Sequence, residues 1–165
     1  MMSMVVFSLL AIAAWFDWQR RKVPNMLTFP VLAAGLLYQW HAGSVAVALT
    51  GVAGAFLLTV GPVVFKGMGM GDQKLLMAVG AWSSWAEIYP LFLHSIWLCL
   101  LFILIYPRSW SRLRDNLRAM ATGWIAHRQF WLPGMDRTAL SFPYAVLLLG
   151  AFLFQHYLHF MGTSQ

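Results

Sequence analysis

The sequence predicts an all-α membrane protein with six transmembrane helices. The first observation is composition: 61% of the 165 residues are hydrophobic and 10% are charged, whereas soluble domains carry roughly 25% charged residues. The second is that long stretches such as 23–65 contain no charged residue, and a chain of this size could bury so much apolar surface only in a bilayer. These observations exclude an ordinary soluble enzyme. The single cysteine, Cys99, excludes a disulfide framework within the chain.

Six apolar segments are the candidate membrane spans, because a spanning helix needs about 20 apolar residues. They cover residues 1–18, 26–40, 45–65, 72–85, 90–106 and 139–160. A turn at 41–44 separates the second segment from the third, and Pro90 is expected in the first turn of the fifth helix. The fourth segment is short, because its fourteen residues reach only about 21 Å across a hydrocarbon core of roughly 30 Å.

The distribution of positive charge predicts that the fourth segment also crosses the membrane. If all six segments cross, the loops 17–25, 66–74 and 107–137 share one side and contain three, two and six Lys and Arg residues, which are all eleven of the chain. Positively charged loops are cytoplasmic. We therefore expect both termini on the non-cytoplasmic side. The net charge of +6 is assigned to orientation and to contact with membrane lipids, and no nucleic acid partner is expected.

The loop 107–137 is expected to contain a cytoplasmic amphipathic helix at the membrane interface, between the fifth and sixth spans. Its apolar residues recur at threes, fours and a seven, which places them on one helical face. They are Trp110, Leu113, Leu117, Met120, Trp124 and Trp131. Arginines occupy other positions on the helical wheel, a pattern typical of a helix lying in the interface. The pattern favours a topological role, and guiding a substrate remains the alternative.

No linker, low-complexity tract or repeat divides the sequence, so we predict a single membrane domain over residues 1–165. Gly51, Gly54 and Gly61 in the third segment are expected to let helices approach closely. His156 and His159 share a helical face, but packing is favoured over metal binding. We therefore expect no metal site and no cofactor.

Two of the five acidic residues are candidate catalytic groups. Asp17 and Asp72 each lie where a loop meets an apolar helix, on the same predicted membrane face, and acidic residues in such positions often mark functional sites. Asp115, Asp136 and Glu87 are interpreted as solvated charges. The simpler interpretation of Asp17 and Asp72 is a helix cap, or a partner for one of the nearby basic residues.

Paired carboxyl groups suit peptide hydrolysis. An ionised carboxylate takes a proton from water, while a protonated carboxyl binds the scissile carbonyl and later protonates the leaving amine. Two carboxylates a few ångströms apart cannot both ionise easily, so such a pair shares a proton and titrates as a unit. Alternating glycines at 67, 69 and 71 precede Asp72 and would let backbone, water or a peptide come close. This segment follows a membrane helix and lacks the Lys-Ser/Thr of a phosphate-binding loop.

The residues around both acids resemble the prepilin peptidases, a family of membrane aspartyl proteases. Gly69-Met70-Gly71-Asp72 resembles their GxGD signature. Residues 17–25, an Asp followed by basic residues and Val-Pro-Asn, resemble the first motif of the family, and residues 142–145 resemble its Pro-Tyr-Gly segment with Ala145 in place of Gly. The resemblance covers residues 17–150.

The resemblance implies cleavage of the basic leader of type IV pilin-like precursors at the cytoplasmic face of the bacterial inner membrane. It implies that Asp17 and Asp72 are catalytic, while the supporting residues are Gly69, Gly71, Lys74, Pro24, Asn25, Pro143 and Tyr144. The expected partner is a prepilin or pseudopilin precursor. Longer relatives carry a four-cysteine metal domain between the first two spans and also N-methylate the product. Only residues 17–25 join those spans here, so we predict no methyltransferase activity and a resemblance to the short subfamily of tight-adherence pili.

A small transporter or ion-conducting subunit is the alternative function, with Asp17 and Asp72 in a proton or cation path. Six spans permit it. Two features argue against it: both acids lie at one membrane face instead of the midplane, and the paired half-helices of transporters are absent from the sequence pattern.

Overall fold

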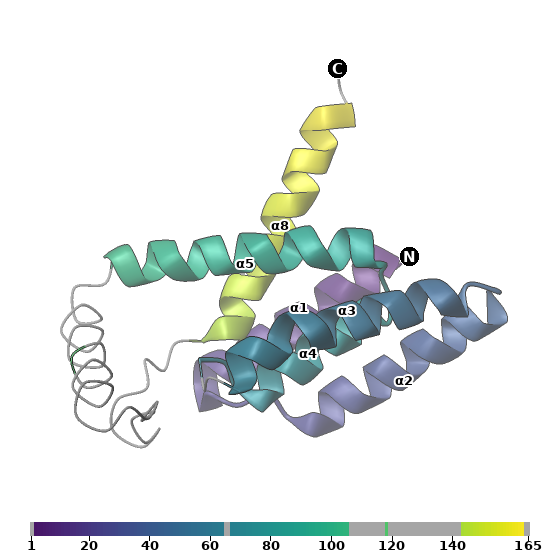
Figure 1. Ribbon diagram of the computed structural model, residues 1–165, viewed down its shortest axis with the longest axis horizontal. Coiled ribbons are helices and arrows are strands. Elements are labelled where there is room, and N and C mark those ends of the chain that lie inside the picture. Colours follow the sequence, from purple (N-terminus) through teal and green to yellow (C-terminus); the bar gives the residue numbers. More distant parts are fainter. Residues whose placement is uncertain (1, 65–66, 106–117, 119–142, 164–165) are drawn as a thin grey trace.

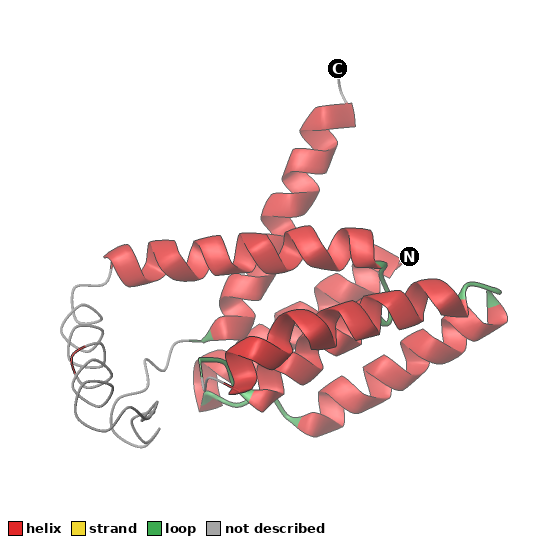
Figure 2. Ribbon diagram, in the orientation of Figure 1, coloured by secondary structure: helices red, strands yellow, loops and turns green. Residues whose placement is uncertain are grey.

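The computed structural model describes residues 2–64, 67–105, 118 and 143–163, and these ranges fold into a bundle of helices (Figures 1 and 2). The helices are α1 (Met2–Arg20), α2 (Asn25–His41), α3 (Val45–Val64), α4 (Met70–Gly80), α5 (Trp85–Ile105) and α8 (Tyr144–Thr163). The all-α prediction is therefore confirmed for the described residues. The amphipathic helix predicted within 107–137 lies outside them, apart from Arg118.

Four of the described helices are long and apolar enough to cross a bilayer, namely α1, α3, α5 and α8. Helix α2 has 17 residues and α4 has 11. The outer faces of the long helices carry exposed apolar side chains, such as Leu57, Trp97 and Leu104. Exposed apolar residues on this scale are typical of surfaces in contact with lipid. Six crossing helices remain a prediction.

Helix α4 is shorter than the predicted segment 72–85, because it ends at Gly80 and the chain turns through residues 81–84 before α5. Its 11 residues have a length of about 16 Å, roughly half of a hydrocarbon core. The helix is nevertheless central: it packs on α1, α2, α3, α5 and α8. Five of its residues are buried, which are Leu75, Leu76, Ala78, Val79 and Gly80. The structure thus places a short helix inside the bundle.

The start of α5 also differs from the prediction. The helix begins at Trp85, so Pro90 lies inside it and not in its first turn. The backbone N–H groups of Glu87 and Ile88 donate to the carbonyl of Ser84, and the Glu87 carboxylate accepts a hydrogen bond of 3.3 Å from the Ser84 N–H. A Glu that reaches back in this way stabilises a helix start. Glu87 is therefore part of a helix cap in the first turn of α5, and it stays exposed, as expected of a solvated charge.

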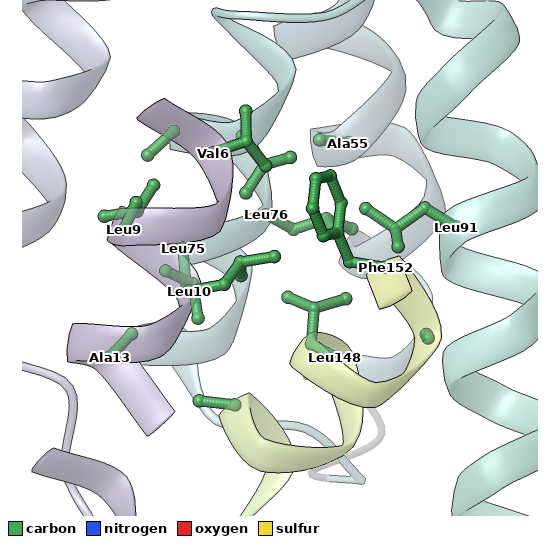
Figure 3. Close-up of a cluster of buried hydrophobic side chains, with 14 of the residues drawn as sticks. Val6, Leu9, Leu10, Ala13, Ala55, Leu75, Leu76, Leu91, Leu148 and Phe152 are labelled. Carbon is green, nitrogen blue, oxygen red and sulfur yellow. The ribbon is translucent and has the colours of Figure 1, made fainter. Parts of the chain in front are cut away.

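The apolar core lies where α1, α4 and α8 face one another, with α3 and α5 closing it (Figure 3). The residues at its centre are Val6, Leu9, Leu10 and Ala13 of α1, Ala55 of α3, Leu75 and Leu76 of α4, Leu91 of α5, and Leu148 and Phe152 of α8. Lipid tails are as apolar as these side chains, so close van der Waals packing is what stabilises this contact in a membrane. The core holds α1, α4 and α8 together, and these are the helices that carry the candidate site.

Glycines set the closest approach of α3 to its neighbours. A Cβ atom at Gly80 of α4 would lie 2.5 Å from the carbonyl oxygen of Gly51, and a Cβ atom at Gly54 would overlap the Trp85 ring. The predicted roles of Gly51 and Gly54 are therefore confirmed. The prediction for Gly61 is not confirmed, because among the described residues a Cβ atom there would meet nothing within 4 Å.

Trp82, in the turn after α4, connects that turn to α2. Its indole Nε1–H donates a hydrogen bond of 2.9 Å to the carbonyl of Val31. The ring stacks on Tyr38 with centroids 5.5 Å apart, and a Cβ atom at Gly35 would lie only 2.8 Å from Nε1. The C-terminal end of α4 is therefore packed tightly on both α2 and α3.

Candidate active site

Asp17 lies on the last turn of α1, and its carboxyl group is held by the start of α8. Its Oδ2 accepts a buried hydrogen bond of 2.9 Å from the backbone N–H of Ala145. Ala145 is the second residue of α8, where backbone N–H groups have no partner within the helix and the helix dipole favours negative charge. Asp17 is only 6% exposed. It therefore caps a helix other than its own.

Asp72 lies in the first turn of α4. Gly69 is the N-cap, so Asp72 is the third helical residue, and its carboxyl group lies beside Gly69. An acidic side chain at this position can reach back to the backbone of the N-cap residue. The side chain is partly buried. The position therefore suits a helix cap, and this does not exclude a second role.

The two aspartates lie at the same end of the bundle although 55 positions separate them in the sequence. Asp17 and Asp72 lie close enough to interact electrostatically, and α1, α4 and α8 are in mutual contact. We call this part of the bundle, where α1 ends and α4 and α8 begin, the aspartate end. Because two negative charges repel at such a position, the arrangement suits a pair that shares one proton.

The two glycines before Asp72 differ in how much space surrounds them. A Cβ atom at Gly69 would lie 3.2 Å from the Asp72 Oδ2, so the carboxyl group would have to shift by a few tenths of an ångström. A Cβ atom at Gly71 would meet Val23 no closer than 3.8 Å, an ordinary contact distance. Of the two glycines, Gly69 is the one whose replacement would disturb the Asp72 carboxyl group. The described residues leave room at Gly71.

Lys74 links the first turn of α4 to the first turn of α2. Its Nζ donates to the Asn25 Oδ1 at 3.3 Å and lies 5.2 Å from the centre of the Phe29 ring. Pro24 is the N-cap of α2, and its carbonyl accepts the Leu27 N–H. The predicted supporting residues of the first motif and of the Asp72 segment are thus close together. Their part in any reaction stays a prediction.

Pro143 and Tyr144 form the start of α8, immediately before the N–H that holds Asp17. The carbonyl of Pro143 accepts the Val146 N–H. The hydroxyl of Tyr144 lies 2.9 Å from the Ser95 Oγ in α5, and both groups are buried. Sequence reasoning missed Ser95, because an isolated serine in an apolar helix carries no signal beyond bonding its own backbone. It also missed Ala145 as a donor, since the group involved is backbone.

One cavity among the described residues lies away from both aspartates. It has a volume of about 530 Å³, and neither aspartate lines it. Its walls include Val6 of α1, Trp82, Glu87 and His156, so it lies near the start of α1, away from Asp17. The described residues contain no group of three His, Cys, Asp or Glu side chains able to hold a metal ion. His156 packs on Phe152, with ring centroids 4.4 Å apart.

Comparison with known proteins identifies the family. Residues 4–104, which include both aspartates, match the model of the type IV leader peptidase family. The chain belongs to this family. The match covers α1 to α4 and nearly all of α5, so the helices that contribute Asp17 and Asp72 lie within the family region. The predicted family is thereby confirmed.

Curated relatives within the family are proteins named prepilin leader peptidase/N-methyltransferase. The relative from Klebsiella pneumoniae is 37% identical over 94 residues, which are 52% of this chain and 41% of the relative. The one from Burkholderia pseudomallei (strain 1026b) is 39% identical over 90 residues, covering 49% and 29%, and the one from Escherichia coli (strain K12) is 36% identical over 81 residues, covering 44% and 36%. The matched region thus spans less than half the length of these relatives. No solved structure matches the chain.

Proposed function

We propose that the chain is an aspartyl endopeptidase that cleaves the N-terminal leader from prepilin or pseudopilin precursors. The observation that carries the proposal is that Asp17 and Asp72 lie at the same end of the bundle, near enough to interact electrostatically, within a region that matches the type IV leader peptidase family. The names of the relatives support prepilins as the substrate class. A transporter is disfavoured, because the family match indicates peptidase chemistry.

The proposed reaction uses both carboxyl groups and one water molecule. The ionised carboxylate accepts a proton from water while the water oxygen attacks the scissile carbonyl carbon. The protonated carboxyl of the other aspartate donates a hydrogen bond to the carbonyl oxygen. The tetrahedral intermediate then breaks its C–N bond, and a carboxyl proton passes to the leaving amine. The hydrogen bond from Ala145 occupies the Asp17 Oδ2, and we assign the Oδ1 to the water.

The proposed location of the site is the cytoplasmic face of the bacterial inner membrane. The loops that contain residues 17–25 and 66–74 adjoin the two aspartates and carry five of the eleven basic residues. Positive loops are retained in the cytoplasm. We therefore place both termini on the non-cytoplasmic side. A precursor helix would lie in the lipid beside the bundle, with its leader at the aspartate end, and nucleic acid has no part in the proposal.

We also propose that the chain does not transfer methyl groups, unlike its named relatives. Only residues 21–24 connect α1 to α2, and Cys99, the single cysteine of the sequence, lies in α5. A four-cysteine site between these helices is therefore impossible in this chain. Incubating the cleaved product with a radiolabelled methyl donor and the purified protein should give no incorporated label, and incorporation would contradict this part of the proposal.

The decisive experiment is co-expression of the chain with candidate prepilins, including those of tight-adherence pili. The native chain should release the leader, whereas Asp17→Asn and Asp72→Asn should each reduce cleavage by about a thousandfold or more, because each removes one half of the acid–base pair. Glu87→Gln is the matched control. It neutralises an acid in the first turn of α5, and the proposed reaction does not use Glu87. Full cleavage by either Asn variant, with the protein inserted in the membrane, would refute the mechanism.

The pH dependence of the rate gives a second test. A pair that must hold one proton loses activity when both carboxyl groups are protonated and when both are ionised. The cleavage rate of the purified protein should therefore fall on both sides of a maximum. A rate that stays flat across the acid and neutral range would rule out a shared proton.

A further inference from the structure

The hydrogen bonds behind Asp17 continue from α8 into α5. Ser95, which is fully buried in α5, donates a hydrogen bond of 2.7 Å to the carbonyl of Phe92. The Ser95 hydroxyl also lies 2.9 Å from the Tyr144 hydroxyl, a contact in which either group can donate. Tyr144 is bonded to Ala145, whose N–H holds the Asp17 carboxyl group. One continuous series of contacts thus runs from α5 through α8 to α1.

We propose that Ser95 is a positioning residue, which acts through Tyr144 to set the first turn of α8 and hence the orientation of the Asp17 carboxyl group. The inference rests on the function proposed above. It is specific to this location, because Tyr144 is the first residue of α8 and is followed directly by Ala145, the donor to Asp17. Tyr144 is also close enough to Asp72 to interact with it electrostatically, so a shift of this turn would alter both sides of the pair.

The contact is well suited to fixing an orientation. Ser95 is 0% exposed and Tyr144 is 9% exposed, so a broken hydrogen bond at this position could not be replaced by water. A buried hydroxyl left without its partner destabilises the state that contains it. The bond therefore favours one placement of the α8 start over neighbouring placements that van der Waals packing alone would permit.

The test compares Ser95→Ala and Tyr144→Phe in the purified full chain. With a precursor that the native chain cleaves, each variant should lower kcat by roughly tenfold and change KM by less than about twofold, because positioning affects the reacting groups more than substrate binding. The maximum of the pH profile should move. The double variant should be no worse than either single variant, since both substitutions remove the same bond. Ser95→Thr, which retains a hydroxyl, should restore most of the rate.

Thr59→Val is the matched control. Thr59 is also 0% exposed, but its hydroxyl donates only to carbonyl groups of its own helix, those of Ala55 and Phe56. Its loss should leave kcat within about twofold of native. A general effect of losing a buried hydroxyl would instead lower the rate of this variant as much as that of Ser95→Ala.

A measurement independent of turnover is the infrared carboxyl band of Asp17, assigned as the band lost in Asp17→Asn. Ser95→Ala should shift this band, and Thr59→Val should not. An unchanged band, or a Ser95→Ala variant that is fully active with a native pH profile, would overturn the inference and leave the proposed function intact. If the native chain cleaves no precursor, or cleaves without Asp17, the proposed function fails and the inference falls with it.

Discussion

The two ends of α4 are held by different kinds of contact. At the C-terminal end, which we call the glycine end, the backbones of Gly51 and Gly80 touch, and Trp82 bonds to α2. At the aspartate end, side chains bond to the starts of helices, and a Cβ atom added at Gly71 would meet only an ordinary contact. The glycine end has no room for an additional atom, whereas the aspartate end could accept a Cβ atom at Gly71.

This difference fits a division of roles. Backbone contact at the glycine end fixes the depth of α4 in the bundle, because no side chain can change its conformation to let the helices slide. Hydrogen bonds at the aspartate end hold the Asp17 carboxyl group and connect Lys74 to Asn25, so this end depends on polar side chains instead of backbone contact. Substitutions that are equal in size should therefore have unequal effects at the two ends.

The largest effect is expected at the glycine end. Gly80→Ala places a Cβ atom 2.5 Å from the Gly51 carbonyl oxygen, and because that atom belongs to backbone, the helices must separate, at a cost of about 2–3 kcal/mol or more in unfolding free energy. Thermal unfolding in detergent should show a clear loss of stability. Gly61→Ala in α3, with nothing within 4 Å, is the control. Equal stability of the two variants would contradict the close packing of α3 on α4.

The next effect concerns the two glycines of the aspartate end. Gly69→Ala should lower kcat by roughly tenfold, because its Cβ atom displaces the Asp72 carboxyl group, while the unfolding temperature stays near native. Gly71→Ala should leave the fold unchanged. If both variants fold and Gly71→Ala loses more activity, then Gly71 faces the substrate rather than the described residues. Measuring kcat and KM for Gly69→Ala and Gly71→Ala distinguishes these two outcomes.

The smallest effect is expected from Trp82→Phe. This change removes the indole N–H that bonds to Val31 and retains a ring that can stack on Tyr38, so the expected loss is about 1 kcal/mol of unfolding free energy. Cleavage should remain near native, because the contact lies at the glycine end. A large loss of activity without a loss of stability would show that the two ends are coupled more strongly than the contacts indicate.

Much of the fold could be predicted from the sequence, because apolar length and charge are local signals. The six helical segments follow from them, and so does the placement of both aspartates at helix ends. The structure differs from the predictions where two local signals compete. Pro90 favours a helix start near residue 90, but the Ser84-to-Glu87 spacing forms a capping box that starts α5 earlier. Trp82 continues the apolar pattern of α4, but it occupies the turn after that helix.

The site could be predicted only in part. Asp17, Asp72 and Gly69 carry signals in their neighbouring residues, and the structure gives each a physical role. Ser95 carries none, because its partner Tyr144 is 49 positions away. Gly61 carries a sequence signal typical of close packing, but none of the described residues lies within 4 Å of a Cβ atom added there. A glycine permits close approach, and only the helix opposite decides whether the approach occurs.

The sequence by itself determined that the chain is a membrane helical protein and that two acidic residues lie at helix ends, because hydrophobic length, charge and glycine spacing are written in consecutive residues. Only the tertiary structure decided what holds those acids. The donor to Asp17 is a backbone N–H from 128 positions away, and every residue except proline carries such a group. This N–H group lacks a partner within its own helix only in the first turn. Packing then determines which helix start meets which carboxyl group.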